Sequence, residues 1–339
     1  MKNKTKYILL AIIIIIVIIS FITYFSTRNQ DNFIRDKENF LSSLPQPNIH
    51  QEYKGNTELT LELSESEFDF PNNLPLLERQ STIEITPEDV TSLSLRLEFV
   101  DKPIISKDQI RGNIYIFNNN TNSLIVIPQI GNIKYTPNKQ AESIIANAIN
   151  KQLTDKNITN IAKDFLLDKI EIPNNNLTHV DTTFLTLNKT LESYQKTSKE
   201  AAVLYQVNFS PIYQKLPLVT LNPLNTPYTV QVMKDGAILN SEIVFPPTYK
   251  TTNTKHKIKN YNQLQDSLNE AYLVSLNDSN VNLPDLDENE VEEITITEVK
   301  LAYLLNDIDN QILQPIFVLE GTTASDLNAI LYLPAISSN

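Results

Sequence analysis

The acidic segment PDLDENEVEE, residues 284–293, carries the oxygen-rich side chains that a calcium site uses. Asp285, Asp287 and Asn289 match the first three ligand positions of an EF-hand type of loop. Glu290 stands where the sharp turn of that loop requires glycine, and Ile296 stands where the bidentate acid belongs. We therefore expect a solvated acidic loop without metal ligands, and weak Ca²⁺ binding is left as the alternative.

Four carboxylates near the C-terminus could supply a general acid and a general base: Glu298, Asp307, Asp309 and Glu320. Glycoside hydrolysis, for example, needs two carboxyl groups about 5 to 9.5 Å apart across a cleft. The sequence does not reveal whether any two of them meet. An envelope hydrolase that uses these carboxylates is therefore kept as an alternative function.

Other catalytic arrangements are incomplete. Ser193 and Lys196 have a Ser-x-x-Lys spacing, but they lie in the polar run SYQKTSKE and no oxyanion partner is recognisable. The histidines, His50, His179 and His256, lie in polar segments without a paired spacing such as HExxH. We therefore predict no catalytic and no metal-ligating residue.

The composition excludes further classes of function. The five glycines are scattered, so no phosphate-binding loop can form and no cofactor is predicted. Lys and Arg number 28 against 40 Asp and Glu, which gives a net charge of −12 and disfavours binding to nucleic acid. Cysteine is absent, which excludes disulfides, thiolate catalysis and iron–sulfur clusters.

The N-terminal segment KYILLAIIIIIVIISFITYF predicts a membrane anchor. Its apolar part, residues 7–25, has the length that an α-helix needs to cross a lipid bilayer. A cleaved signal peptide is the alternative, but its apolar core is usually shorter and a small-x-small site follows it. Three lysines precede the span, so we expect a cytoplasmic N-terminus and an extracytoplasmic C-terminal region in a single-pass protein of the cell membrane.

The chain beyond the anchor predicts an α+β fold made of about three units, each a helix followed by antiparallel strands. Residues 1–27 are assigned to the cytoplasmic N-terminus and the anchor, and the polar residues 28–56 to a juxtamembrane stalk. The three units are placed at 57–137, 138–248 and 249–339. Helical spacing of apolar residues occurs at 141–149, 158–166 and 264–272.

The segment ITPEDVTSLSLRLEF in the first unit gives two signals. Thr86 and Pro87 are typical of the start of a helix. Leu93, Leu95 and Leu97 alternate as they would in a strand. A helix over residues 87–99 is favoured, with a strand as the alternative.

The segment LAYLLNDIDNQILQPIFVLEG, residues 301–321, predicts a hairpin. Two apolar strands flank polar turn residues at 306–310. Pro315 cannot donate to a central ladder of hydrogen bonds. It therefore predicts an edge strand or a bulge.

The order of these segments resembles the YycH/YycI type of membrane-anchored regulatory protein and the PepSY-like modules related to it. The likeness is best over residues 196–336 and rests on a helix at Tyr261–Tyr272 and an aromatic-rich strand at Gln314–Glu320. Phe317 stands where the family often has Trp, and the chain contains no Trp. By this resemblance the second unit is PepSY-like and the third is YycI-like.

The resemblance implies a regulatory or sensory module that has no catalytic residues. Its expected partners are the bilayer, through residues 7–25, and another membrane or envelope protein such as a sensor kinase. A chaperone or inhibitor domain is a further alternative, for which an exposed apolar groove or an open sheet edge would be the structural sign.

Overall fold

The computed structural model describes residues 57–81, 85–138, 153–172, 177–188, 193–223, 225–276, 279–280, 291–305 and 311–337. These residues all belong to one compact unit, Ile49–Asn339. The predicted anchor, the stalk, residues 284–290 of the acidic run and the turn at 306–310 lie outside the described residues. In the described ranges, no helix combines the length and the hydrophobicity that crossing a bilayer requires.

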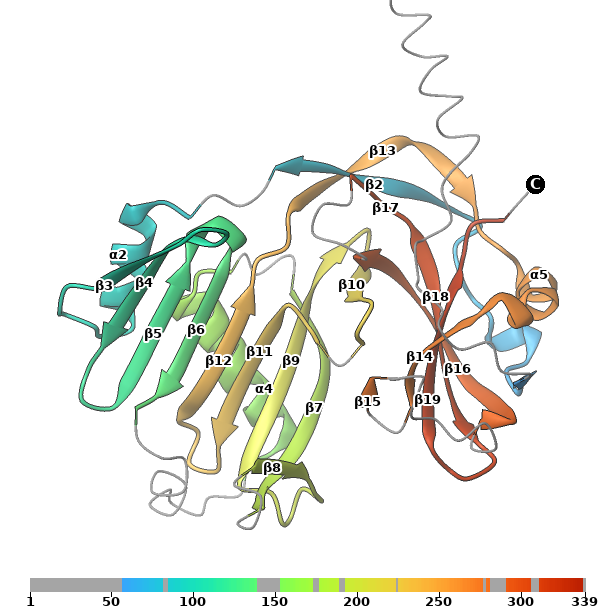
Figure 1. The fold of residues 1–339 in the computed structure, drawn as a ribbon. Helices are drawn as coiled ribbons and strands as arrows, with labels where there is room; N and C mark the ends of the chain where they lie inside the picture. The colour runs from blue at the N-terminus through green and yellow to red at the C-terminus, as the bar shows by residue number, and fades with distance from the viewer. Residues whose placement is uncertain are drawn as a thin grey trace, which may run out of the picture. The chain divides into compact units, whose positions relative to one another are not determined.

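Strands dominate the described part of the chain (Figure 1). Its helical segments are short: α2 Pro87–Arg96, α4 Asp155–Asp164, α5 Tyr261–Asp266, the 3-10 turns η1 Glu65–Glu67, η2 Pro128–Ile130 and η5 Leu268–Glu270, and the π-helical turn η3 Phe165–Lys169. The strands are β1 Glu58–Leu61, β2 Asn73–Ser81, β3 Ile104–Asp108, β4 Gly112–Asn118, β5 Asn122–Ile127, β6 Asn132–Pro137, β7 Leu177–Asn188, β8 Ser193–Lys196, β9 Leu204–Tyr213, β10 Leu216–Thr220, β11 Tyr228–Met233, β12 Ile238–Val244, β13 Thr248–Lys257, β14 Tyr272–Leu276, β15 Ser279–Asn280, β16 Glu293–Leu305, β17 Ile312–Leu313, β18 Pro315–Thr323 and β19 Asn328–Pro334.

The described strands form two sheets. Sixteen of them make one sheet, in which the order β15-β14-β19-β18-β16-β10-β9-β11-β12-β6-β5-β4-β3 forms the main path. Off this path, β1 pairs with β16, and β7 pairs with β8 and β9. The remaining three strands form a small sheet in the order β13-β2-β17.

The predicted α+β fold of helix-plus-sheet units is wrong. The described chain is mostly β-sheet, and strands from all three predicted units join the same large sheet. Strand β12 of the second unit pairs with β6 of the first, and β16 of the third pairs with β1 and β10. Strand pairing is non-local, so alternation within each segment could not reveal these partners. The unit boundaries as such stay predictions.

The alternation of polar and apolar residues does explain which face of β9 packs against the helices. In β9, Tyr205, Val207 and Phe209 join the core formed with α2 and α4, whereas Gln206 and Asn208 lie on the opposite face. Figure 1 shows α4 behind the strands of this part of the sheet. The face away from α4 is thus the polar one.

The C-terminal strands follow the same rule with a different helix. Phe317 and Leu319 of β18 pack in a core that includes Leu264 of α5. Val318 and Glu320 alternate with them and therefore point to the other face. The half of the large sheet that contains β9 thus has α2 and α4 on one face, and the half that contains β18 has α5 on one face. The second face of each half is left for other contacts.

Three helix predictions can be compared with the structure. The favoured helix at 87–99 is confirmed as α2, which ends at Arg96. Thr86 Oγ1 accepts a hydrogen bond from the Asp89 N–H at 3.2 Å, and the Asp89 carboxylate accepts one from the Thr86 N–H at 2.8 Å. The helix predicted at 158–166 is confirmed as α4 and η3. The one at 264–272 is shorter than expected, because Tyr272 already begins β14. Residues 141–149 lie outside the described part.

The prediction for Pro315 is wrong. Pro315 begins β18, which pairs with β16 on one side and with β19 on the other, so β18 is a central strand. Strand β17, just before it, pairs with β2 of the small sheet. The chain therefore passes from one sheet to the other at Pro315. Because Pro315 is the first residue of its strand, its missing N–H group is tolerated there.

Candidate functional site

A cavity of about 740 Å³ lies where β7, β8, β9 and β10 face β16, β18 and β19. Its volume lies within the roughly 300–1,000 Å³ that small-ligand sites usually have. The second faces of the two halves of the sheet, which carry no helix, supply its walls. The cavity is therefore a consequence of how the strands of the large sheet are paired.

One wall is polar. Asn208 is only 4% exposed and donates from Nδ2 to Asp181 Oδ1 at 2.9 Å, while its Oδ1 accepts from Thr229 Oγ1 at 3.0 Å. The hydroxyl of Thr183 donates to Asp181 Oδ2 at 3.1 Å. This network satisfies the buried amide and both carboxylate oxygens, and it holds Asp181 in place.

The opposite wall is mainly apolar. Ala302 of β16, Val318 of β18, and Ile330 and Tyr332 of β19 line it. The hydroxyl of Tyr332 donates to the carbonyl oxygen of Thr220 at 2.8 Å. Burial raises the pKa of Tyr332 well above its ordinary value, so this phenol remains a neutral donor.

A charged group lies at the border of the apolar wall. The Nζ of Lys300 is 2.7 Å from Glu320 Oε1 and 3.1 Å from Glu298 Oε2. Desolvation acts against the charge of Lys300, but the hydrogen bonds and charges of Glu320 and Glu298 outweigh it and raise the pKa of the ammonium group. Glu298 and Glu320 are direct cross-strand neighbours. An ammonium group therefore occupies the position between them that a hydrolase keeps for water or the scissile bond.

Of the four predicted carboxylates, only Glu298 and Glu320 can be placed, because Asp307 and Asp309 lie outside the described residues. Glu320 lines the cavity and Glu298 does not. The two acids thus do not face each other across the cavity. This arrangement disfavours the paired-carboxylate hydrolase.

The predicted Ser-x-x-Lys pair lies on a strand and not on a helix. Ser193 and Lys196 begin and end β8, where residues three apart belong to opposite faces. The segment therefore lacks the helical geometry in which this spacing would bring the pair together. Lys196 lines the cavity, and so does Tyr194 between them.

Tyr194 is the unsatisfied polar group of the cavity. Its Oη is buried and finds no hydrogen-bond partner within the described ranges, and burial raises the pKa of this phenol. A buried hydroxyl without a partner destabilises the folded chain, because it has given up its hydrogen bonds to water.

The histidines contribute no metal site. His179 lines the cavity, where its Nε2 lies 2.9 Å from Thr182 Oγ1 and its ring packs edge-on against Phe209. His256 lies on β13, and burial lowers its pKa. Over the residues that the structure covers, no three His, Asp or Glu side chains group as metal ligands would. His50 and residues 284–290 lie outside that part.

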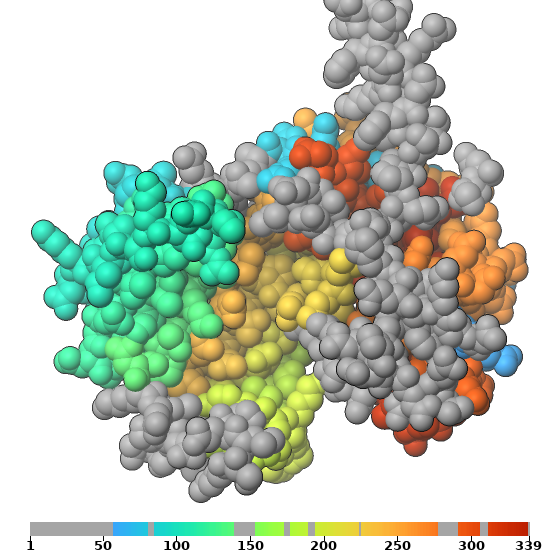
Figure 2. Space-filling model, in the orientation of Figure 1, coloured from blue at the N-terminus to red at the C-terminus, as the bar shows by residue number. Residues whose placement is uncertain are grey.

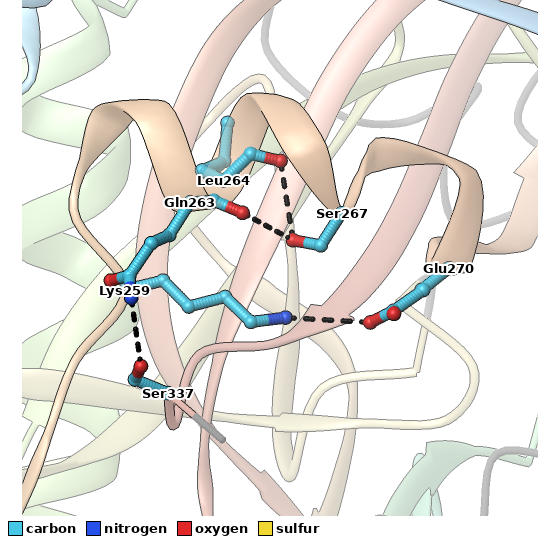
Figure 3. A network of polar contacts seen from close by, with 6 residues as sticks. All are labelled: Lys259, Gln263, Leu264, Ser267, Glu270 and Ser337. Carbon is cyan, nitrogen blue, oxygen red and sulfur yellow. Dashed lines mark hydrogen bonds and ion pairs between the residues drawn. The ribbon is translucent and has the colours of Figure 1, made fainter. Parts of the chain in front are cut away.

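A second polar network surrounds the largely buried Lys259 (Figure 3). Its side chain is 8% exposed and runs along α5 to Glu270, with Nζ 3.6 Å from Glu270 Oε2. Gln263 Nε2 donates to Ser337 Oγ at 3.0 Å, and Ser267 Oγ donates to the Gln263 carbonyl at 2.8 Å. The network fastens α5 to the C-terminal residues.

A third feature is an open sheet edge with exposed apolar side chains. Strand β3 ends the large sheet and pairs only with β4 in the part of the chain that is described. Exposed large apolar residues concentrate beside it: Leu95, Val100, Ile104, Ile105 and Ile110. Figure 2 shows this segment in teal at the rim of the face in view. Such an edge is the sign expected for a protein-interaction surface.

The sequence prediction missed most of the cavity residues. Asn208, Asp181 and Lys300 were not recognised, because none of them belongs to a motif. The alternation of polar and apolar residues in LYQVNFS is typical of a strand with one polar face. Nothing in the sequence showed which other strand that face would meet.

Comparison with known proteins gives little further guidance. No family model matches the chain, and no curated protein matches it. One solved structure that is similar is an uncharacterized protein from Eubacterium rectale, with 14% identity, a TM-score of 0.48, and coverage of 80% of this chain and 87% of that chain. This likeness is too weak to support an argument, and the resemblance to the YycH/YycI type stays a prediction.

Proposed function

We propose that the chain is a single-pass, membrane-anchored protein of the cell envelope whose extracytoplasmic region binds another protein and has no catalytic site. The observation that carries the proposal is the cavity, in which Lys300 and Asp181 are engaged by neighbouring side chains. Lys300 is neutralised by Glu298 and Glu320, and Asp181 is held by Asn208 and Thr183. Groups engaged in this way can shape a binding site but are not free to act as acid, base or nucleophile.

The anchor rests on the sequence of residues 7–25, which has the length and hydrophobicity of a membrane span. A protein tethered in this way meets its partners in or near the same membrane. A membrane or envelope protein, such as a sensor kinase, is therefore the kind of partner we propose. The exposed apolar edge at β3 offers a second contact surface in addition to the cavity.

Photocrosslinking from inside the cavity tests this function. We would place p-benzoylphenylalanine at Asn225 or, separately, at Thr178, both of which line the cavity, and at the exposed Lys255 of β13 as the control. The full chain is expressed in its membrane and irradiated. Both cavity positions should give the same discrete adduct with one envelope protein, and Lys255 should not.

Repeating the experiment with residues 7–25 exchanged for an unrelated span separates two modes of recognition. An adduct that persists after the exchange places recognition in the extracytoplasmic region, as proposed. Absence of any adduct from both cavity positions, or identical adducts from Lys255, would contradict the proposed function.

A further inference from the structure

We propose that the cavity takes an extended peptide segment of the partner protein, which adds as a new strand to the free edge of β7. The inference rests on the proposed binding function and specifies how that site recognises its partner. Backbone hydrogen bonds along β7 would provide affinity, and the apolar wall would select the side chains of the peptide.

The edge of β7 is open next to the cavity. On one side β7 pairs with β9 from Leu177 to Leu185. On the other side β8 covers only Leu185–Asn188, and one more hydrogen bond runs from the Thr197 N–H to the Phe184 carbonyl. Among the described strands none pairs with residues 177–183 on that second side. Alternate residues of this stretch therefore direct backbone N–H and C=O groups outward.

The same edge points into the cavity. Thr178, His179, Val180 and Asp181 all line it, although successive residues of a strand point to opposite faces. Four consecutive lining residues are what a strand presents when its edge, and not one face, borders a space. The backbone groups of β7 are thus accessible from the cavity.

The edge carries only part of the usual protection against pairing. Natural edges are guarded by proline, charged side chains, β-bulges or a covering element. The stretch LTHVDTT at 177–183 contains neither proline nor lysine, and its one carboxylate, Asp181, is held by Asn208 and Thr183. Its register with β9 shifts between His179 and Asp181, which leaves Val180 outside the regular ladder. Val180 is an apolar residue that remains 46% exposed. These features fit an edge that is kept available for a further strand.

The walls indicate the chemistry of the peptide. Side chains of an added strand that point into the cavity would meet Ala302, Val318 and Ile330, which favour apolar and β-branched residues at alternate positions. Lys300 is already neutralised, so no charged side chain is needed to match it. An extended segment with apolar residues at alternate positions is therefore the occupant that fits.

The test selects peptides and then asks whether they bind through the edge. A phage-displayed library of random 12-residue peptides is panned against the full chain in detergent micelles, with counter-selection on the Val180→Pro variant. This substitution removes a backbone donor at the one edge position that lies outside the β9 ladder. Selected peptides are synthesised, and their Kd is measured by fluorescence anisotropy.

Selected peptides should bind the natural chain and the Val180→Thr variant equally, because threonine keeps the backbone donor and the branched shape. Binding should weaken about fivefold or more with Val180→Pro, and also with Val180→Lys, which leaves the backbone intact but puts a charge on the edge. In an added strand, every second peptide N–H faces β7. Methylation of those nitrogens should weaken binding by a similar factor, and methylation of the intervening nitrogens should not. Circular dichroism and melting curves identify variants that remain folded.

Three outcomes would overturn the inference. One is that no peptide is enriched over the counter-selection. The second is that selected peptides bind all Val180 variants alike, or lose affinity equally with either set of nitrogens methylated. The third is that tetra-N-acetylchitotetraose binds in the cavity and no peptide does, which would assign the site to a glycan. If the crosslinks from Thr178 and Asn225 persist in these cases, only the peptide mode fails, whereas loss of those crosslinks removes the proposed function too.

Discussion

At the scale of single residues, the positions of Glu320 and Lys300 depend on a neighbouring glycine. The register between β16 and β18 shifts between Ile296 and Glu298, and Gly321 lies opposite that shift. A Cβ atom on Gly321 would lie 2.2 Å from the backbone oxygen of Thr295. The close approach of the two backbones therefore requires a residue without a side chain. The ion pairs of Lys300 with Glu298 and Glu320 lie beside this position and depend on the approach.

We predict that Gly321→Ala destabilises the protein by about 1–3 kcal/mol, the usual cost of overpacking, because the atom that the new Cβ meets belongs to the backbone and cannot turn aside. Urea unfolding monitored by circular dichroism measures the change. Thr322→Ala, the next position of β18, removes atoms and serves as the control, with a smaller expected loss. Equal stability of Gly321→Ala and the natural chain would show that the strands can separate there without cost.

At the scale of elements, α5 is held by a lysine that runs beneath it (Figure 3). Lys259 precedes the N-cap residue Asn260, and its Nζ reaches Glu270 in η5 beyond the end of the helix. Desolvation lowers the pKa of Lys259, and the charge of Glu270 opposes this effect. The buried methylene stem packs under the helix, whereas the ammonium group is stabilised mainly by one carboxylate.

The two partners should therefore respond differently to substitution. Glu270→Gln leaves the ammonium group without its counter-charge and should cost about 1 kcal/mol, less than the ~3–5 kcal/mol of fully buried pairs because Glu270 is itself exposed. Lys259→Met keeps the stem and removes the charge, so its free energy of unfolding should stay closer to that of the natural chain. Chemical unfolding of both variants under the same conditions provides the comparison. A larger loss in Lys259→Met than in Glu270→Gln would contradict this account of the network.

At the scale of the whole molecule, the large sheet connects segments that are distant in the sequence. Strand β16 pairs in parallel with β1 along Glu293–Ile296 and with β10 along Tyr303–Leu305, while β18 covers its other side. The face of β9 that bears Asn208 and the face of β18 that bears Val318 meet around the cavity because of these pairings. The site thus combines residues of the second and third predicted units and belongs to neither of them alone.

The predicted orientation of this region in the membrane can be tested with cysteine labelling, because the natural chain contains no cysteine and gives no background. Val100→Cys is placed at a position that is 84% exposed, and Lys4→Cys at the predicted cytoplasmic end. A membrane-impermeant maleimide added to intact spheroplasts should label Val100→Cys at once and Lys4→Cys only after lysis. The fully buried Ala202→Cys should react only after unfolding. The reverse order for Val100 and Lys4 would place the C-terminal region in the cytoplasm.

The sequence by itself determined local structure at positions where the physical cause is local. Thr86, Pro87 and Asp89 start α2 because capping involves only the first turn of a helix, and this signal prevailed over the alternation of the following leucines. The polar–apolar alternation of β9 is likewise typical of a strand with one apolar face, whereas the apolar run of β18 is typical of a strand buried on both faces. The absence of cysteine and the scattered glycines excluded whole classes of chemistry.

Only the tertiary structure decided which strands pair and where a site forms. Hydrogen bonds between strands use backbone groups that every residue carries, so the sequence of β16 does not name β1, β10 and β18 as its neighbours. For the same reason Pro315 marks a passage between two sheets, and not the edge that its chemistry alone suggested. The cavity combines Asn208, Lys300 and the open edge of β7, none of which belongs to a recognisable motif, because its shape arises from the packing of distant strands.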